Sequence, residues 1–112
     1  MATKRNPLKL NPLQLKTLAL LQELARHPEH ATRRGEDVMV TQLPAAHGDH
    51  FHVGDFAVAA RDATGLSNPA VYAVLERKGL IRSLYPMGAV LTAQGLAYDT
   101  GMREHILHGR HG

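Results

Sequence analysis

Residues 54–79 read GDFAVAARDATGLSNPAVYAVLERKG, and this stretch decides the fold. It has the pattern of two short helices joined by a tight turn. Asp55 can cap the first helix, because its carboxylate accepts the unpaired N–H groups of the first turn. Apolar residues then recur on one face of that helix, at Phe56, Ala57, Ala60 and Ala63. Gly65 interrupts the pattern and suits the left-handed conformation that ends many helices.

The second helix is predicted over residues 68–78. Ser67 or Asn68 can cap it, and Pro69 suits its first turn, where a backbone N–H is not needed. Its apolar stripe consists of Val71, Val74 and Leu75. Gly79 ends the helix.

A β-hairpin is predicted directly after the second helix. Residues 80–85 have the composition of a strand, residues 86–88 (Pro-Met-Gly) that of a turn, and residues 89–91 that of the returning strand. Thr92 can then cap a further helix that extends through about His108.

A helix, a turn, a second helix and a two-stranded wing together resemble the winged helix-turn-helix domain of bacterial regulators, the MarR-like group especially. The resemblance covers roughly residues 50–98. The residues that carry it are Ala60, Thr64-Gly65-Leu66-Ser67, Gly79-Leu80-Ile81 and Leu91-Thr92-x-x-Gly95. It implies an α+β, mainly helical fold with a short wing and extra terminal helices, and a DNA-binding transcriptional regulator.

One spacing departs from this pattern. The spacing from Val71 of the second helix to Gly79 is about one turn shorter than is usual for the family. A shorter helix extends less far into a major groove, so a winged helix used for protein–protein contact is the alternative function.

The rest of the chain predicts a single domain over residues 12–108, between a basic arm at 1–11 and a tail at 109–112. Asn11 and Pro12 begin a helix that runs to about His27. Residues 28–37 are predicted to be a charged loop, and 38–43 and 50–53 to be strands.

The helix that begins at Pro12 carries apolar residues over an unusually wide arc. They are Leu13, Leu15, Leu18, Leu20, Leu21, Leu24 and Ala25. One packed face needs an apolar stripe of only somewhat more than about 100°. The excess predicts either a homodimer contact or a helix buried deep in its own core.

Composition limits the partners. The chain has 112 residues, no cysteine and a net charge of +3, which permits a nucleic-acid partner and excludes disulfides. No apolar run reaches the length of a membrane span, and these features together predict a cytoplasmic protein. Residues 54–92 hold four basic and three acidic side chains, whereas residues 1–34 hold seven and two.

The DNA-contacting residues are predicted on the outer side of the second helix and near the wing. Tyr72 follows Val71 and is expected to turn away from the core, and asparagine and arginine side chains can recognise base edges. The predicted set is Ser67, Asn68, Ala70, Tyr72, Ala73, Arg77 and Arg82.

A histidine cluster is the feature that a winged helix explains least. His47, Asp49, His50 and His52 lie within six residues, and His50 and His52 share a face if the segment is extended. Such a set can hold a divalent transition metal, which gives a metal-responsive regulator as a second alternative. No other cofactor and no catalytic residues are predicted.

Overall fold

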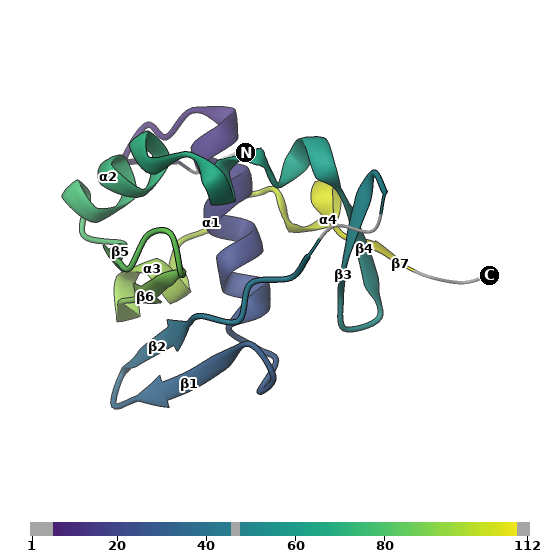
Figure 1. Cartoon of the computed structure of the whole chain (residues 1–112). Coiled ribbons are helices and arrows are strands. Elements are labelled where there is room, and N and C mark those ends of the chain that lie inside the picture. The colour runs from purple at the N-terminus through teal and green to yellow at the C-terminus, as the bar shows by residue number, and fades with distance from the viewer. Residues whose placement is uncertain (1–5, 46–47, 110–112) are drawn as a thin grey trace.

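The computed structural model describes residues 6–45 and 48–109, and it has an α+β fold in which two antiparallel sheets lie on different sides of helix α1 (Figure 1). In chain order the elements are α1 (Pro12–Leu24), β1 (Ala31–Arg34), β2 (Asp37–Val40), β3 (His50–Val53), β4 (Phe56–Ala59), the 3-10 turns η1 (Ala60–Asp62) and η2 (Thr64–Ser67), α2 (Pro69–Arg77), β5 (Ile81–Ser83), β6 (Ala89–Leu91), α3 (Ala93–Ala97), α4 (Arg103–Ile106) and β7 (His108–Gly109).

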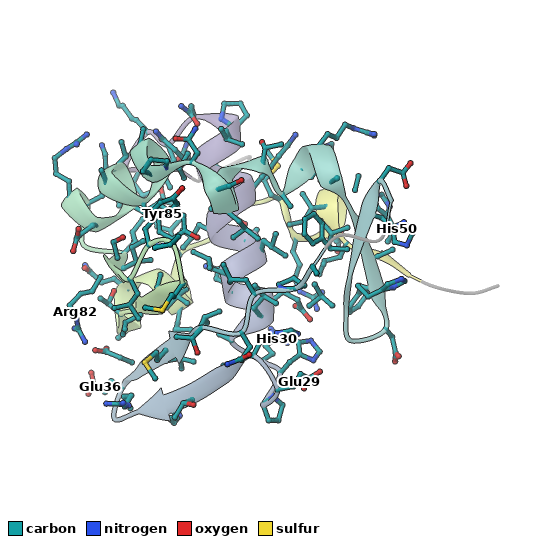
Figure 2. All side chains as sticks on the ribbon, viewed as in Figure 1. Glu29, His30, Glu36, His50, Arg82 and Tyr85 are labelled. Carbon is teal, nitrogen blue, oxygen red and sulfur yellow. The ribbon has the colours of Figure 1, made fainter. Side chains whose placement is uncertain are left out.

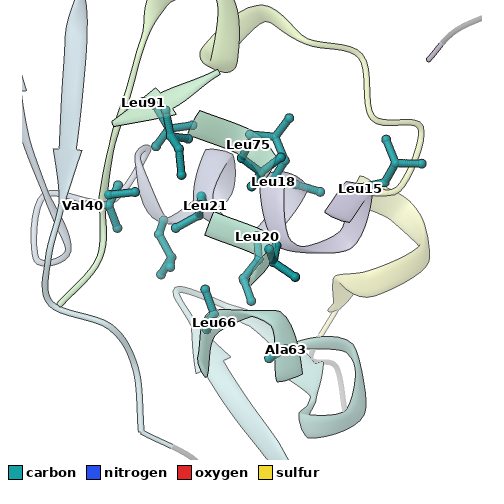
Figure 3. Packing of buried hydrophobic residues seen from close by; sticks show 14 of the residues in the cluster. Leu15, Leu18, Leu20, Leu21, Val40, Ala63, Leu66, Leu75 and Leu91 are labelled. Carbon is teal, nitrogen blue, oxygen red and sulfur yellow. The ribbon is translucent and has the colours of Figure 1, made fainter. Parts of the chain in front are cut away.

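Helix α1 is the centre of the core. It begins at the predicted residue with a capping box, in which Asn11 and Gln14 bond each other's backbone N–H groups, and it ends at Leu24. Figure 3 shows its leucines between Leu75 and Leu91 on one side and Leu66 on the other. The protein's own elements bury the wide apolar arc. A contact with a second copy of the chain is therefore not needed to explain the arc.

The sheet order is β1-β2-β6-β5 in one sheet and β3-β4-β7 in the other. The predicted hairpin forms, with Ile81 opposite Leu91 in β5 and β6. The predicted strand at 38–43 is present only in part, because β2 begins at Asp37 and ends at Val40. The predicted charged loop is wrong in part, because Ala31–Arg34 form strand β1, which pairs with β2.

The predicted first helix of residues 55–63 is wrong. Gly54 has a φ of +58° and opens a two-residue turn, so that Phe56 pairs with Val53 and the chain continues as β4. Asp55 lies exposed in that turn instead of capping a helix. The alanines favour a helix locally, but pairing with β3 on one side and β7 on the other outweighs this preference.

The two 3-10 turns η1 and η2 replace the end of that helix, and Gly65 has a packing role there. It does not adopt the left-handed conformation. A Cβ on Gly65 would lie 1.8 Å from Oγ1 of Thr17, so glycine allows η2 to pack directly on α1. Asp62 of η1 is buried and accepts a hydrogen bond from Nζ of Lys16 at 2.8 Å.

The predicted single helix from Thr92 to His108 is also wrong. Thr92 does cap α3, accepting from the N–H of Gly95, but α3 ends at Ala97. Asp99 and Thr100 then bond the N–H groups of Gly101 and Met102, and such side-chain bonds compete with a helix. Helix α4 and strand β7 follow instead.

Residues 6–11, which the sequence placed in the basic arm, pack against the domain. Leu10 is buried, and the N–H of Leu8 donates to the hydroxyl of Tyr98. Nζ of Lys78, just after α2, donates to the carbonyl of Leu8 at 2.8 Å. This segment is therefore joined to the end of α2.

Candidate nucleic-acid interface

Helix α2 is defined by local signals at both ends. The Asn68 side chain accepts from the N–H of Ala70, Pro69 occupies the first turn, and Gly79 has a φ of +80° after the last turn. Of the two proposed caps, Ser67 and Asn68, the structure therefore uses Asn68. Val71 and Leu75 are buried on the inner side, as the apolar stripe predicts.

Most of the predicted DNA-contacting residues lie on the exposed surface of α2 and of strand β5, which packs next to it. Asn68 is half-buried at its edge. The exposed members are Ser67, Ala70, Ala73, Arg77 and Arg82. We call this surface the α2 face.

Tyr72 is not on that surface, and its expected exposure is wrong. Its side chain is 1% exposed, and its hydroxyl donates to the carbonyl of Leu66 at 3.0 Å. Its ring meets that of Tyr85 edge to face, with the centroids 5.1 Å apart, and the Tyr85 hydroxyl donates to the carbonyl of Ser67. The two tyrosines therefore hold the hairpin turn against the junction of η2 and α2.

This burial has a consequence for stability at high pH. Burial first, and then the neighbouring Tyr85, raise the pKa of Tyr72 from 10.0 to about 12. Between those values the unfolded chain loses the phenolic proton before the folded protein does. The contribution of the protonated Tyr72 to the unfolding free energy is therefore complete below about pH 10. About 2 to 3 kcal/mol of unfolding free energy should be lost by about pH 12.

Urea denaturation at several pH values from 8 to 12, on the native chain and on Tyr72→Phe, measures this effect. The difference in unfolding free energy between the native chain and Tyr72→Phe should shrink as pH rises from about 10 to 12. The effects of all other titrating groups are the same in both proteins and cancel in this difference. A constant difference over that range would show that Tyr72 titrates normally.

The two arginines of the α2 face differ in whether they form an ion pair. Arg77 forms no ion pair with any residue in the described ranges. Arg82 reaches Asp37 at 3.3 Å across the sheet, and this pair is at the surface. Exposed pairs contribute only about 0–1 kcal/mol, so another anion can replace Asp37 at little cost.

The hairpin turn carries two exposed apolar side chains that the sequence analysis did not single out. Met87 is 63% exposed and Tyr85 38%, and Figure 2 shows Tyr85 on the same side of α1 as Arg82. The signal was present as Tyr-Pro-Met in a predicted turn, where polar residues are more usual.

The histidine cluster lies elsewhere. His50 and His52 are on β3, and Figure 2 shows His50 on the opposite side of α1 from Arg82. His50 and Asp49 lie 3.4 Å apart between Nδ1 and Oδ1. His47 lies outside the described residues. Strand pairing also places His108 of β7 on the same sheet face as His52, with Ala57 between them, which sequence reasoning missed because it expected a helix there.

A cleft of about 330 Å³ lies beside α1, with Glu23 at its wall and Arg26, Arg33 and Arg103 among its lining residues. Glu23 is 3% exposed. Its carboxylate accepts from Arg103 at 2.9 Å and lies 3.1 Å from Nε2 of His27. These partners balance a buried charge that would otherwise be costly, which explains Glu23 as part of the fold.

No family model, curated protein or solved structure matches this chain. Across residues 6–45 and 48–109, no helix is both long and apolar enough to span a bilayer.

Proposed function

We propose that this chain binds double-stranded DNA as a transcriptional regulator, with α2 in the major groove and the β5–β6 hairpin as a wing. The observation that carries the proposal is the α2 face, where exposed Ala70, Ala73 and Arg77 lie on a helix that leads directly into a hairpin whose first strand carries the exposed Arg82. In the winged helices that the sequence resembles, a helix likewise leads into a hairpin, although the helix expected before it at 55–63 is replaced here by β4 and the two 3-10 turns.

The dimensions of α2 support the proposal. An α-helix with its side chains is about 10–12 Å across, and a major groove about 12 Å wide admits it; the nine residues of α2 give a length of about 13.5 Å. Ala70 and Ala73 allow the helix backbone to approach the bases closely. Arg77 lies in the last turn of α2 and Arg82 on β5, and both side chains are exposed, so each can reach a phosphate.

Arg77→Ala and Arg82→Ala test this function. Each should weaken binding to duplex genomic fragments, measured by fluorescence anisotropy, and each should lower the slope of log affinity against log salt by about 1. Arg61→Ala is the matched control, because Arg61 is an exposed arginine of η1 outside α2 and β5. It should leave that slope unchanged.

The opposite outcome favours the protein-contact alternative. Met87 and Tyr85 form an apolar hairpin tip, whereas a tip that follows a DNA backbone gains from positive charge. If no salt-sensitive complex forms at low salt, or if Arg61→Ala weakens binding as much as Arg77→Ala, the DNA proposal is abandoned. Substitution of Met87 by glutamate should then abolish binding to the protein partner without changing the fold.

A further inference from the structure

The outer face of the β3-β4-β7 sheet carries a histidine pair. Along β3, Phe51 and Val53 face inward and are the more buried, while His50 and His52 face outward. On β4 the positions opposite the two histidines are Ala59 and Ala57. The β4 neighbours of the two imidazoles are therefore small, and the His50 side chain is half-buried while His52 is exposed.

The two imidazoles converge through the same type of nitrogen. Nε2 of His50 lies 3.1 Å from Nε2 of His52, and the ring planes are 86° apart. Metal–imidazole bonds are about 2.1 Å long. For an ion bound to both Nε2 atoms, the nitrogen–metal–nitrogen angle would therefore be about 95°. That angle lies between the ideal values of octahedral and tetrahedral coordination.

Asp49 supplies the partner that ligand histidines commonly have. Its carboxylate is fully exposed and faces Nδ1 of His50 at 3.4 Å. A proton held on Nδ1 by a carboxylate leaves Nε2 as the unprotonated nitrogen, which is the form that binds a metal, and it fixes the orientation of the ring. Nε2 is the atom that faces His52.

We propose that His50 and His52 bind one divalent transition-metal ion, of the Ni²⁺, Cu²⁺ or Zn²⁺ type, through their Nε2 atoms. Imidazole nitrogen is a ligand that these ions share. No group of three metal-binding side chains assembles within the ranges the structure describes, so water completes the coordination. Asp49 acts as a positioning residue for His50.

The site is independent of the proposed DNA binding. It lies across α1 from Arg82 (Figure 2), and β3 is an edge strand of its sheet. An ion joined to two β3 side chains fixes that strand in its extended form. Because it binds only the folded arrangement, it should raise the unfolding temperature by mass action.

The test is a calorimetric titration of the full chain with NiCl₂, followed by thermal unfolding with and without the ion, both in the absence of DNA. One ion per chain is expected. Loss of a carboxylate that orients a ligand histidine typically weakens metal binding about 10–100-fold, so Asp49→Asn should show a loss of that order. His50→Ala and His52→Ala, which remove ligands, should show at least as much and should lose the thermal shift.

His105→Ala is the control, because His105 is an exposed histidine of α4, outside this sheet. Its affinity should equal that of the native chain. Retention of binding in His50→Ala or His52→Ala, or loss of binding in His105→Ala, would overturn the site. Asp49 is at the surface and outside the core, so Asp49→Asn keeps the test valid even if a histidine variant fails to fold.

Discussion

Replacing Tyr72 with alanine should destabilise the protein by about 3 to 5 kcal/mol, the usual cost of deleting a large buried aromatic side chain. The side chain is 1% exposed, contacts the ring of Tyr85 and bonds the carbonyl of Leu66. Its loss leaves a cavity between η2, α2 and the hairpin turn. Domains of this size are stable by only about 5 to 15 kcal/mol, so urea denaturation should show a large fall in midpoint.

Tyr72→Phe is the matched variant. It keeps the ring and removes only the hydroxyl, so its cost should be about 1 to 3 kcal/mol, as expected for a buried carbonyl left without its partner. The alanine variant should therefore lose clearly more than the phenylalanine variant. If Tyr72→Ala lost less than about 1 kcal/mol, as exposed positions do, the side chain would have to be in solvent.

Gly95→Ala should also destabilise the protein, by about 3 kcal/mol, at the upper end of the range for overpacking. A Cβ at this position would lie 1.9 Å from the carbonyl oxygen of Leu80 and 2.9 Å from its carbon. These are backbone atoms and cannot rotate away. The same oxygen accepts from the N–H and the hydroxyl of Thr92, so a shift would also disturb the cap of α3.

Helix propensity alone predicts the opposite sign for this substitution. Alanine favours a helix interior over glycine by about 1 kcal/mol, so a stabilised Gly95→Ala would show that α3 and Leu80 are not in contact. Gly109→Ala is the control, because a Cβ there meets no atom of residues 6–45 or 48–109 within 4 Å. Its unfolding free energy should change by less than about 0.5 kcal/mol.

Local signals were sufficient for the elements whose ends are marked in the chain itself. Asn11 with Pro12, and Asn68 with Pro69, begin the two longest helices, and Gly79 ends α2. The β5–β6 hairpin and the cap at Thr92 also follow from neighbouring residues. In each case the element is set by a hydrogen bond between residues close together in the chain, or by the backbone conformation of a single residue.

The candidate sites divide in the same way. His50 and His52 approach because an extended strand puts alternate residues on one face, and this was visible in the sequence. The α2 face was found from helical spacing, except at Tyr72. Helical spacing assigned Tyr72 to the outside because it cannot reveal that a hairpin turn thirteen residues later folds back and covers it.

Only the tertiary structure decided the remaining elements. Phe56–Ala59 could form a turn of helix, and they form a strand because β3 and β7, the latter some fifty residues later, supply partners for their backbone groups. Gly65 was expected only to end a helix, yet a Cβ there would meet the Thr17 side chain, just as a Cβ on Gly95 would meet the backbone of Leu80. Local propensity amounts to tenths of a kcal/mol per residue, whereas burial and close packing contribute several, so long-range contacts determine these elements.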